Sequence, residues 1–225
     1  INTPHSPTGK VFSREELTAV AKLCQKWGVL CFTDEIYEHI LYDQHKHVAM
    51  ATIPGMEDLT VTINSLSKTY SVTGWRVGWA VARPELTLPI RKVHDFLTVG
   101  SPAPLQRAGV TAVNMQDKYY QELADEYAKR REYMLETLDL VDIPYYAPEG
   151  AYYAFCDVSK FGYESDLAFT KYRVKDVGVA VGPGGSFFGN DNPLKNKYVR
   201  FCFSRKPETL SAAREKLKEL KACKK

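Results

Sequence analysis

The sequence lacks long apolar runs. No stretch approaches the roughly 18 residues that a membrane-spanning helix requires, and no basic segment leads into an apolar one at the start. These two absences predict that the protein has no membrane partner and lies in the cytoplasm.

Paired cysteines are also missing. The five cysteines are odd in number, include no C-x-x-C pair, and stand at positions 24, 31, 156, 202 and 223. A structural zinc site and a secreted disulfide framework both need paired or clustered cysteines. The cysteine pattern therefore fits neither of them and favours a reducing compartment.

An excess of one charge is missing as well. The chain holds 30 Lys+Arg against 27 Asp+Glu, a net charge of +3, which is too small to indicate a nucleic-acid partner. The lysine-rich end, residues 216–225, is typical of the solvated end of a terminal helix. The length of 225 residues, 44% of them hydrophobic, allows one large domain or two small ones with substantial cores.

The first half of the chain alternates between helical and strand patterns. Ser13 and Glu16 have capping-box spacing, and the apolar periodicity that follows predicts a helix from there to Gly28. Apolar runs at 29–35, 59–68 and 76–82 predict strands. This alternation indicates a layered α/β architecture with a mostly parallel sheet, in which ligands sit at the carboxyl ends of the strands.

The second half predicts a smaller α+β unit. Residues 117–140 are charged with an apolar stripe, which predicts a long amphipathic helix bridging two domains. Strand patterns follow at 151–158 and 198–203, with helical segments near 165–177 and from residue 207.

Three short motifs fail on inspection. PTGK is not a phosphate loop, because Pro4 stands where that motif needs glycine. GGSFFG is not the elbow of a serine hydrolase, because Phe188 occupies the final glycine position. Asp43, His45 and His47 are better read as a polar surface loop than as a metal site, since no further spaced ligand accompanies them.

Ser65 to Lys68 also fits the S-x-x-K motif of penicillin-recognising acyl transferases, in which the serine is the nucleophile. The companion motifs SDN and KTG are absent, and the tetrad ends a predicted strand where the acyl transferases open a helix. A lysine at the end of a buried strand has another use, because its amine can condense with a carbonyl group.

Polar side chains gather at the ends of two predicted strands. One strand delivers a carboxylate and a phenol, and the next delivers hydroxyls and an amine, with a guanidinium following: Asp34, Tyr37, Ser65, Ser67, Lys68 and Arg76. Pyridoxal phosphate needs a partner for its pyridinium nitrogen, a partner for its ring oxygen, a Schiff-base amine and a phosphate cradle. The set predicts a site for this cofactor.

The strings that carry these residues resemble the class I and II aminotransferases, the fold-type I pyridoxal-phosphate enzymes, and in particular the branch with kynurenine and glutamine transaminases. The matching strings lie between residues 1 and 204: NTPHSPTGKVFSREEL, FTDEIYEHILYD, INSLSKTYSVTGWRVGW, PEGAYYAF and YVRFCFS. The resemblance implies the C-terminal part of a large three-layer αβα domain with its bridging helix over 1–137, and a small α+β domain over 138–225. It also implies a homodimer and a role in amino-acid metabolism and biosynthesis.

The resemblance assigns a role to each site residue. Lys68 would be the Schiff-base lysine and the catalytic base, Asp34 the pyridinium partner, and Tyr37 the donor to the ring oxygen. Ser65 and Arg76 would hold the phosphate. Arg200 would bind the substrate carboxylate through its bidentate fork, which suits that task better than a lysine.

The resemblance also has a departure at Ser6, where the family motif usually has an asparagine that donates to the cofactor's ring oxygen. Serine is shorter, so Tyr37 becomes the main expected donor. The same motif implies a cis Ser6–Pro7 peptide bond.

The sequence predicts exchange of an amino group between an amino acid and a 2-oxo acid. The alternatives are a cysteine-S-conjugate type C–S lyase on the same scaffold and a catalytically incompetent fragment. The chain opens with Ile1 inside a turn-rich segment, from which we expect a piece of a longer chain that binds the cofactor weakly on its own.

Overall fold

The computed structural model describes residues 1–220. The chain forms two compact units: unit 1 comprises residues 1–5 and 10–124, and unit 2 comprises residues 6–9 and the chain from residue 125 onward. Three positions of the lysine-rich end, 221, 224 and 225, and Cys223 lie outside the described residues.

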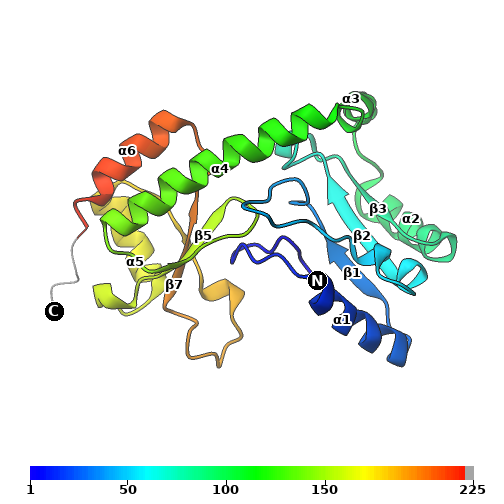
Figure 1. The fold of residues 1–225 in the computed structure, drawn as a ribbon, viewed down its shortest axis with the longest axis horizontal. Helices are drawn as coiled ribbons and strands as arrows, with labels where there is room; N and C mark the ends of the chain where they lie inside the picture. The colour runs from blue at the N-terminus through cyan, green and yellow to red at the C-terminus, as the bar shows by residue number, and fades with distance from the viewer. Residues whose placement is uncertain (221–225) are drawn as a thin grey trace. The chain divides into compact units, whose positions relative to one another are not determined.

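Unit 1 is built on a three-stranded sheet of order β1-β2-β3, with strands β1 (Cys31–Asp34), β2 (Thr60–Ser65) and β3 (Gly78–Val81). Strands β1 and β2 pair in parallel, and β2 and β3 pair antiparallel (Figure 1). An isolated parallel bridge joins Asn2 to Asp34 beside β1. The parallel pair brings the carboxyl ends of β1 and β2 to one edge, and Asp34 and Ser65 are the last residues of these two strands.

Helix α1 (Arg14–Trp27) forms where the sequence predicts it. Ser13 and Glu16 make both bonds of the capping box, and Gly28 ends the helix in the left-handed conformation, with φ of 61°. Its buried face packs against β1 and the segment that follows β1, in a core of Leu17, Ala21, Cys24, Cys31, Met50, Ile53 and Met56. This core fixes β1 from one side. The segment includes the short 3-10 helices Met50–Thr52 and Glu57–Leu59.

Helices α2 (Pro84–Thr98) and α3 (Ala103–Val113) follow the sheet and were not predicted from the sequence. Helix α2 has Pro89 in its interior and no buried residue. A proline inside a helix removes a backbone hydrogen bond, so Pro89 argues against a helix at this position. The apolar residues of α2 nevertheless recur with helical spacing, so the sequence does carry a helix signal here. The 3-10 turn Thr73–Trp75 lies between β2 and β3.

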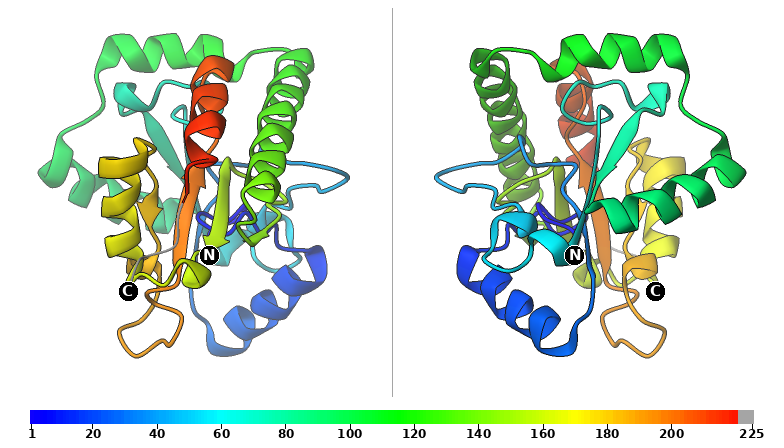
Figure 2. Two further views of the ribbon diagram at one scale, coloured as in Figure 1. Left: turned by 90° about the vertical axis from the view of Figure 1, so that its left-hand side faces the viewer. Right: turned by 90° about the vertical axis from the view of Figure 1, so that its right-hand side faces the viewer.

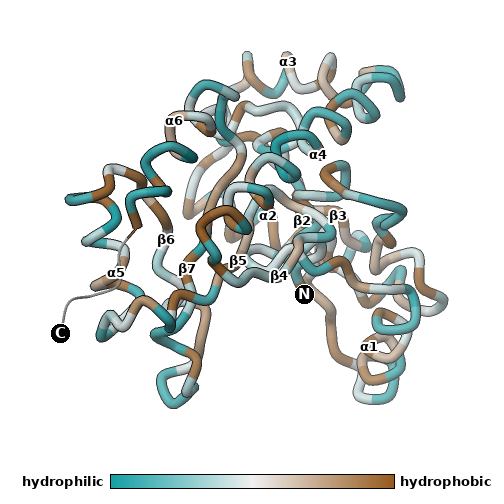
Figure 3. Tube along the Cα trace, turned by 60° about the vertical axis from the view of Figure 1, so that its left-hand side comes forward, coloured by the Kyte–Doolittle hydropathy of each residue, from teal (hydrophilic) through white to brown (hydrophobic). Residues whose placement is uncertain are grey.

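Helix α4 (Asp117–Leu140) has the bounds that the sequence predicts, and its trace is largely hydrophilic in Figure 3. The division between the two units falls within this helix, between Ala124 and Asp125. Its buried residues all lie in the unit 2 part: Tyr127, Met134, Thr137 and Leu138.

Unit 2 contains a four-stranded antiparallel sheet of order β4-β5-β7-β6. Its strands are β4 (Tyr145–Tyr146), β5 (Tyr153–Asp157), β6 (Gly182–Pro183) and β7 (Tyr198–Cys202). Helices α5 (Asp166–Tyr172) and α6 (Pro207–Leu217) and the second part of α4 pack around it (Figure 2). Helix α5 continues into a π-helical turn, Arg173–Val177, and the short 3-10 turns Ser159–Phe161 and Gly185–Phe187 complete the unit.

The tetrapeptide 6–9 belongs to unit 2 although its neighbours in sequence belong to unit 1. The carbonyl of Gly9 accepts hydrogen bonds from the backbone N–H groups of Glu149 and Gly150, both at 2.9 Å. Gly9 has φ of 75°, and a Cβ there would overlap Pro148, so the position requires glycine. The Ser6–Pro7 peptide is cis, as expected, and so is Thr3–Pro4.

Among the described residues, no helix combines the length and the apolar character needed to cross a membrane.

Candidate active site

Asp34 ends strand β1, where its backbone is fixed by the first residues of the chain. Its N–H donates to the carbonyl of Ile1 at 2.9 Å, and its carbonyl accepts from the N–H of Thr3 at 3.1 Å. One carboxylate oxygen, Oδ1, accepts from the N–H of Ile36 at 3.2 Å. Within residues 1–220 this carboxylate has no other hydrogen-bond partner, so Oδ2 is left to accept from a ligand.

Tyr37 and Lys68 come together although 31 positions of sequence separate them. Tyr37 follows β1 and is only 3% exposed. Lys68 lies in the turn after β2, and its Nζ stands 5.9 Å from the centroid of the Tyr37 ring. An ammonium within about 6 Å of an aromatic ring is attracted by the ring face. The structure thus places the predicted Schiff-base amine beside the predicted phenol.

The turn that carries Lys68 is held by side chains on both sides of that residue. Ser65 Oγ accepts from the N–H of Ser67 at 3.1 Å, and Thr73 Oγ1 donates to the Ser67 carbonyl at 3.0 Å. Tyr119 Oη donates to the Thr69 carbonyl at 2.7 Å. These three bonds fix the backbone immediately before and after Lys68, which preorganises its amine.

Arg76 precedes β3 in the left-handed conformation, with φ of 55°. Its Nη1 donates to the Thr73 carbonyl at 3.1 Å, and its own carbonyl accepts from Ser101 Oγ at 2.9 Å. Non-glycine residues in this region of φ are uncommon and concentrate at functional sites. The guanidinium is exposed, so it is open to an anionic ligand.

Arg200, in unit 2, lies in the middle of β7. Its guanidinium carbon stands 4.1 Å from the centroid of the Tyr153 ring and 5.4 Å from that of Phe187. This stacking orients the planar fork. The described residues offer Arg200 no carboxylate partner, so its remaining N–H donors are available to one.

Ser6 is brought to Arg200. Nη1 of Arg200 donates to Ser6 Oγ at 3.3 Å, across 194 positions of sequence. Both residues belong to unit 2, whereas the other predicted site residues belong to unit 1. The expected contact of Ser6 with the cofactor stays a prediction.

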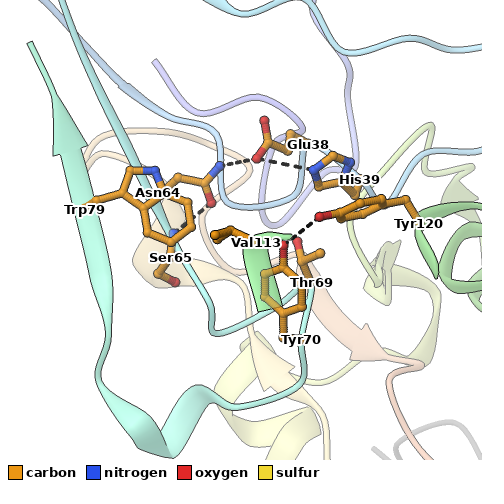
Figure 4. Close-up of a pocket in the computed structure, with 9 residues that line it drawn as sticks. All are labelled: Glu38, His39, Asn64, Ser65, Thr69, Tyr70, Trp79, Val113 and Tyr120. Carbon is orange, nitrogen blue, oxygen red and sulfur yellow. Dashed lines mark hydrogen bonds and ion pairs between the residues drawn. The ribbon is translucent and has the colours of Figure 1, made fainter. Parts of the chain in front are cut away.

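A cavity of about 200 Å³ lies in unit 1 beside the end of β2. It is lined by Glu38, His39, Asn64, Ser65, Thr69, Tyr70, Trp79, Val113 and Tyr120 (Figure 4). The hydroxyls of Tyr70 and Tyr120 are 2.9 Å apart, and burial together with this bond raises the pKa of Tyr70 above its ordinary value. Tyr70 therefore remains a neutral hydroxyl at physiological pH.

The interpretation of residues 43–47 as a polar surface loop is right for Asp43 and His45, which are exposed, and wrong for His47. The His47 side chain is 10% exposed, and its Nε2 lies 2.8 Å from Glu35 Oε2. Glu35 also accepts from Thr33 Oγ1 and from the N–H of Met50, both at 3.1 Å. The buried carboxylate draws His47 inward, because a buried charge needs several hydrogen-bond donors.

Sequence reasoning missed the residues that hold the predicted ones in place. Asn64, Glu38 and Tyr119 were not singled out, and neither was Tyr153 beneath Arg200. One signal was available: Asn64 is an amide inside a predicted strand, TVTINS, where a buried amide must find partners. The other contacts join distant segments and leave no local pattern.

The donor set in unit 1 fits pyridoxal phosphate. A carboxylate with a free oxygen can accept from a pyridinium N–H, and the amine beside the phenol can condense with the cofactor's aldehyde. Ser65 and exposed Arg76 supply hydroxyl and guanidinium groups that suit a phosphate. Each requirement of the cofactor has a residue of matching chemistry in this unit.

Similarity to known proteins covers almost the whole chain. The family model for aminotransferase class I and II matches residues 1–217. Kynurenine–oxoglutarate transaminase 3 of Rattus norvegicus is 38% identical over 232 residues, which cover 96% of this chain and 51% of that protein. Kynurenine–oxoglutarate transaminase 1 of Homo sapiens is 34% identical over 240 residues, covering 98% and 57%.

A solved aminotransferase structure is also similar to this chain. N-succinyldiaminopimelate aminotransferase from Mycobacterium tuberculosis superposes with a TM-score of 0.92 at 32% identity, covering 97% of this chain and 56% of that one. This match confirms the expected fold class of an aminotransferase-type α/β protein. The chain spans just over half the length of the relatives it matches.

Proposed function

The chain belongs to the class I and II aminotransferase family. On this basis we propose that it forms part of an enzyme that moves an amino group between an amino acid and a 2-oxo acid with pyridoxal phosphate. The observation that carries this proposal is the position of Lys68 Nζ, 5.9 Å from the Tyr37 ring centroid, at the end of two parallel strands. We further propose that residues 1–137 belong to the cofactor-binding large domain and 138–225 to the small domain.

Pyridoxal phosphate supplies, when bound, an electron sink for the pair released as the substrate's α C–H bond breaks. Oδ2 of Asp34 would accept a hydrogen bond from the ring nitrogen and so favour its protonated form. The hydroxyl of Tyr37 would donate to the ring oxygen, with Ser6 as a second proposed contact. Ser65 Oγ and the guanidinium of Arg76 would hold the phosphate.

Lys68 has two tasks. Its amine would hold the cofactor covalently when no substrate is bound. Nζ would also be the base that removes the proton from the α carbon of the substrate. The fixed backbone on both sides of Lys68 limits how far this amine moves between the two tasks.

Arg200 is the proposed binder of the substrate α-carboxylate. Its fork is stacked on Tyr153 and has donors left for two parallel N–H···O bonds. Since the relatives are named kynurenine–oxoglutarate transaminases, kynurenine and 2-oxoglutarate are the first amino donor and acceptor to test. A homodimer, a cytoplasmic location and a biosynthetic role belong to the same proposal.

The function is tested by the visible absorption spectrum of the protein with pyridoxal phosphate, followed by kynurenine or other amino acids. A transaminase converts the cofactor's absorption on adding an amino acid and restores it on adding 2-oxoglutarate. Release of pyruvate from a cysteine S-conjugate would instead support the C–S lyase. A protein that gives neither response while folded would contradict the proposal.

We expect the chain on its own to bind pyridoxal phosphate more weakly than a full-length relative does, because it aligns with just over half of such a relative. Cofactor affinity is the measurement, by titration of the absorbance change. Addition of the remaining, unaligned part of a relative is expected to tighten binding and raise turnover. Equal affinity with and without that polypeptide would show that the chain holds a complete site.

Arg200→Lys is expected to raise the amino-acid concentration needed for half-maximal conversion by roughly tenfold or more, for all α-amino acids alike. Lysine keeps the positive charge but loses the bidentate fork, and a charge-assisted pair contributes about 1.5–3 kcal/mol. The half-maximal concentration is read from the spectral titration. Arg205→Lys, at an exposed position close in sequence, is the matched control and should leave it unchanged. Equal behaviour of both variants would remove Arg200 from the substrate site.

A further inference from the structure

Asn64 is a buried amide, 6% exposed, and it is the penultimate residue of β2. Its Oδ1 accepts from the N–H of Ser65 at 2.7 Å. Its Nδ2 donates to Glu38 Oε1 at 2.5 Å and to the carbonyl of Glu35 at 3.3 Å. Only this orientation of the amide pairs every donor with an acceptor. All three hydrogen bonds belong to unit 1.

The partners of Asn64 are the sequence neighbours of proposed site residues. Glu35 directly follows Asp34, Glu38 directly follows Tyr37, and Ser65 begins the turn that carries Lys68. One side chain therefore ties the segment that supplies the carboxylate and the phenol to the segment that supplies the amine (Figure 4). Backbone pairing between β1 and β2 ends where the N–H of Glu35 donates to the Ile63 carbonyl at 3.0 Å, and Asn64 adds its side-chain bonds beyond that point.

The contact with Glu38 is the shortest of the three hydrogen bonds, at 2.5 Å. The acceptor is a carboxylate, and hydrogen bonds to ionised groups are shorter and stronger than neutral ones. Nε2 of His39 lies 3.6 Å from Glu38 Oε1, which is too long for a hydrogen bond. The hydrogen bond from Asn64 is therefore the closer of these two contacts of Glu38 Oε1.

We propose that Asn64 is a positioning residue for the cofactor site, holding the segment of Asp34 and Tyr37 in fixed register with that of Ser65 and Lys68. The expected effect on cofactor binding rests on the proposed function. The register of the two segments is a property of the protein without cofactor. Asn64 does not touch the reacting atoms. It acts through the backbone of residues 35 and 65 and the side chain of Glu38.

Asn64→Asp is the sharpest test, because it keeps the shape and the acceptor for Ser65 while removing both donors and facing Glu38 with a second carboxylate. In the protein without cofactor, we expect amide hydrogen exchange of Glu35, whose N–H donates to the Ile63 carbonyl, and of Ile36 to become about tenfold faster, and the Kd for pyridoxal phosphate to rise by a similar factor. The share of cofactor that borohydride traps at Lys68 should fall as the Kd rises. This share is measured by peptide mapping.

The double variant Asn64→Asp with Glu38→Gln is the rescue. The amide of the introduced glutamine can donate to the introduced aspartate, which restores the link with donor and acceptor exchanged. We expect it to recover most of the slow exchange and of the affinity. Asn114→Asp is the matched control, since the amide of Asn114 also donates to a backbone carbonyl, that of Val110 at 2.6 Å, but at an exposed site. It should behave as the unmodified protein.

Tryptophan fluorescence verifies folding of each variant, because Trp27, Trp75 and Trp79 all lie in unit 1. Should Asn64→Asp not fold, Asn64→Ala removes the three bonds without adding charge, and the same changes are expected. Unaltered exchange of Glu35 and Ile36 in a folded variant would overturn the positioning role, as would a double variant that recovers nothing. Absence of Lys68 labelling in the unmodified protein would overturn the proposed function instead, while the exchange measurement still decides the role of Asn64.

Discussion

Lys68→Ala is expected to abolish incorporation of pyridoxal phosphate trapped by borohydride at this site. The reaction needs a primary amine, and alanine has none. Lys68→Arg should lose the labelling as well, because a guanidinium keeps the charge but stays protonated and does not condense with the aldehyde. The pair of variants separates the amine from its charge. The measurement is peptide mapping of the reduced adduct by mass spectrometry.

The control for this experiment is Lys118→Ala. Lys118 is 79% exposed and lies 3.5 Å from Glu122 on the surface of α4, so its loss should leave the labelling of Lys68 intact. Persistence of the full adduct in Lys68→Ala, carried by another lysine, would contradict the proposed site at the ends of β1 and β2.

Arg173→Met is expected to stabilise unit 2 by roughly 1–4 kcal/mol, because it replaces an uncompensated buried charge with an apolar chain of similar length. Arg173 is fully buried, with 0% exposure. None of its three guanidinium nitrogens has a hydrogen-bond partner among the described residues. Burial lowers its pKa from 12.5 to about 10, so the folded state disfavours the charge while leaving it present at neutral pH.

The surroundings of Arg173 compensate only in part. Its guanidinium carbon lies 5.3 Å from the ring centroid of Phe201 and 5.8 Å from that of Phe169. Such ring contacts contribute about 0.5–2 kcal/mol, which is less than the several kcal/mol that an unpaired buried ion costs. Methionine can keep the packing against both rings without that cost.

The sign of the pH effect follows from the lowered pKa. Charging Arg173 costs stability at every pH below about 10 and stops costing it as pH rises toward 12.5, where the side chain is neutral in both states. The advantage of Arg173→Met should therefore be complete at pH 7. The change in stability is measured by urea unfolding at pH 7. Amide hydrogen exchange in β7 then assigns the change to unit 2.

Lys171→Met is the control for Arg173, since Lys171 is exposed on the same helical segment and should change stability by less than about 0.5 kcal/mol. A lower unfolding midpoint for Arg173→Met would contradict the prediction and mean that the guanidinium has a compensating partner.

Local signals in the sequence were enough for several of the regular elements. Ser13 and Glu16 marked the start of α1 and Gly28 its end, and the apolar stripe of residues 117–140 gave both ends of α4. Helix α2 was not predicted: Pro89 stands in its interior, although its apolar residues recur with helical spacing. The π-helical turn Arg173–Val177 escaped too, since periodicity does not separate it from the α-helix it continues.

The candidate site likewise has a part that local sequence patterns predict and a part that they do not. Asp34, Tyr37 and Lys68 were predicted as site residues from their places at strand ends, and the structure brings Lys68 beside Tyr37. The contact of Ser6 with Arg200 joins residues 194 positions apart, and no local pattern encodes such a pairing. The three bonds of Asn64 likewise depend on the turns after β1 and β2, which the strand pattern leaves undefined.

The membership of residues 6–9 in unit 2 has a consequence for dissecting the protein. The chain passes from one unit to the other three times, after His5, after Gly9 and after Ala124. Cleavage within α4 would therefore not release two whole units. A fragment starting at Asp125 would lack the peptide whose Gly9 carbonyl receives the N–H groups of Glu149 and Gly150, and with it the hydroxyl beside Arg200. Independent folding of unit 2 would require that tetrapeptide to be returned, either as a synthetic peptide or by circular permutation that joins it to the C-terminal half.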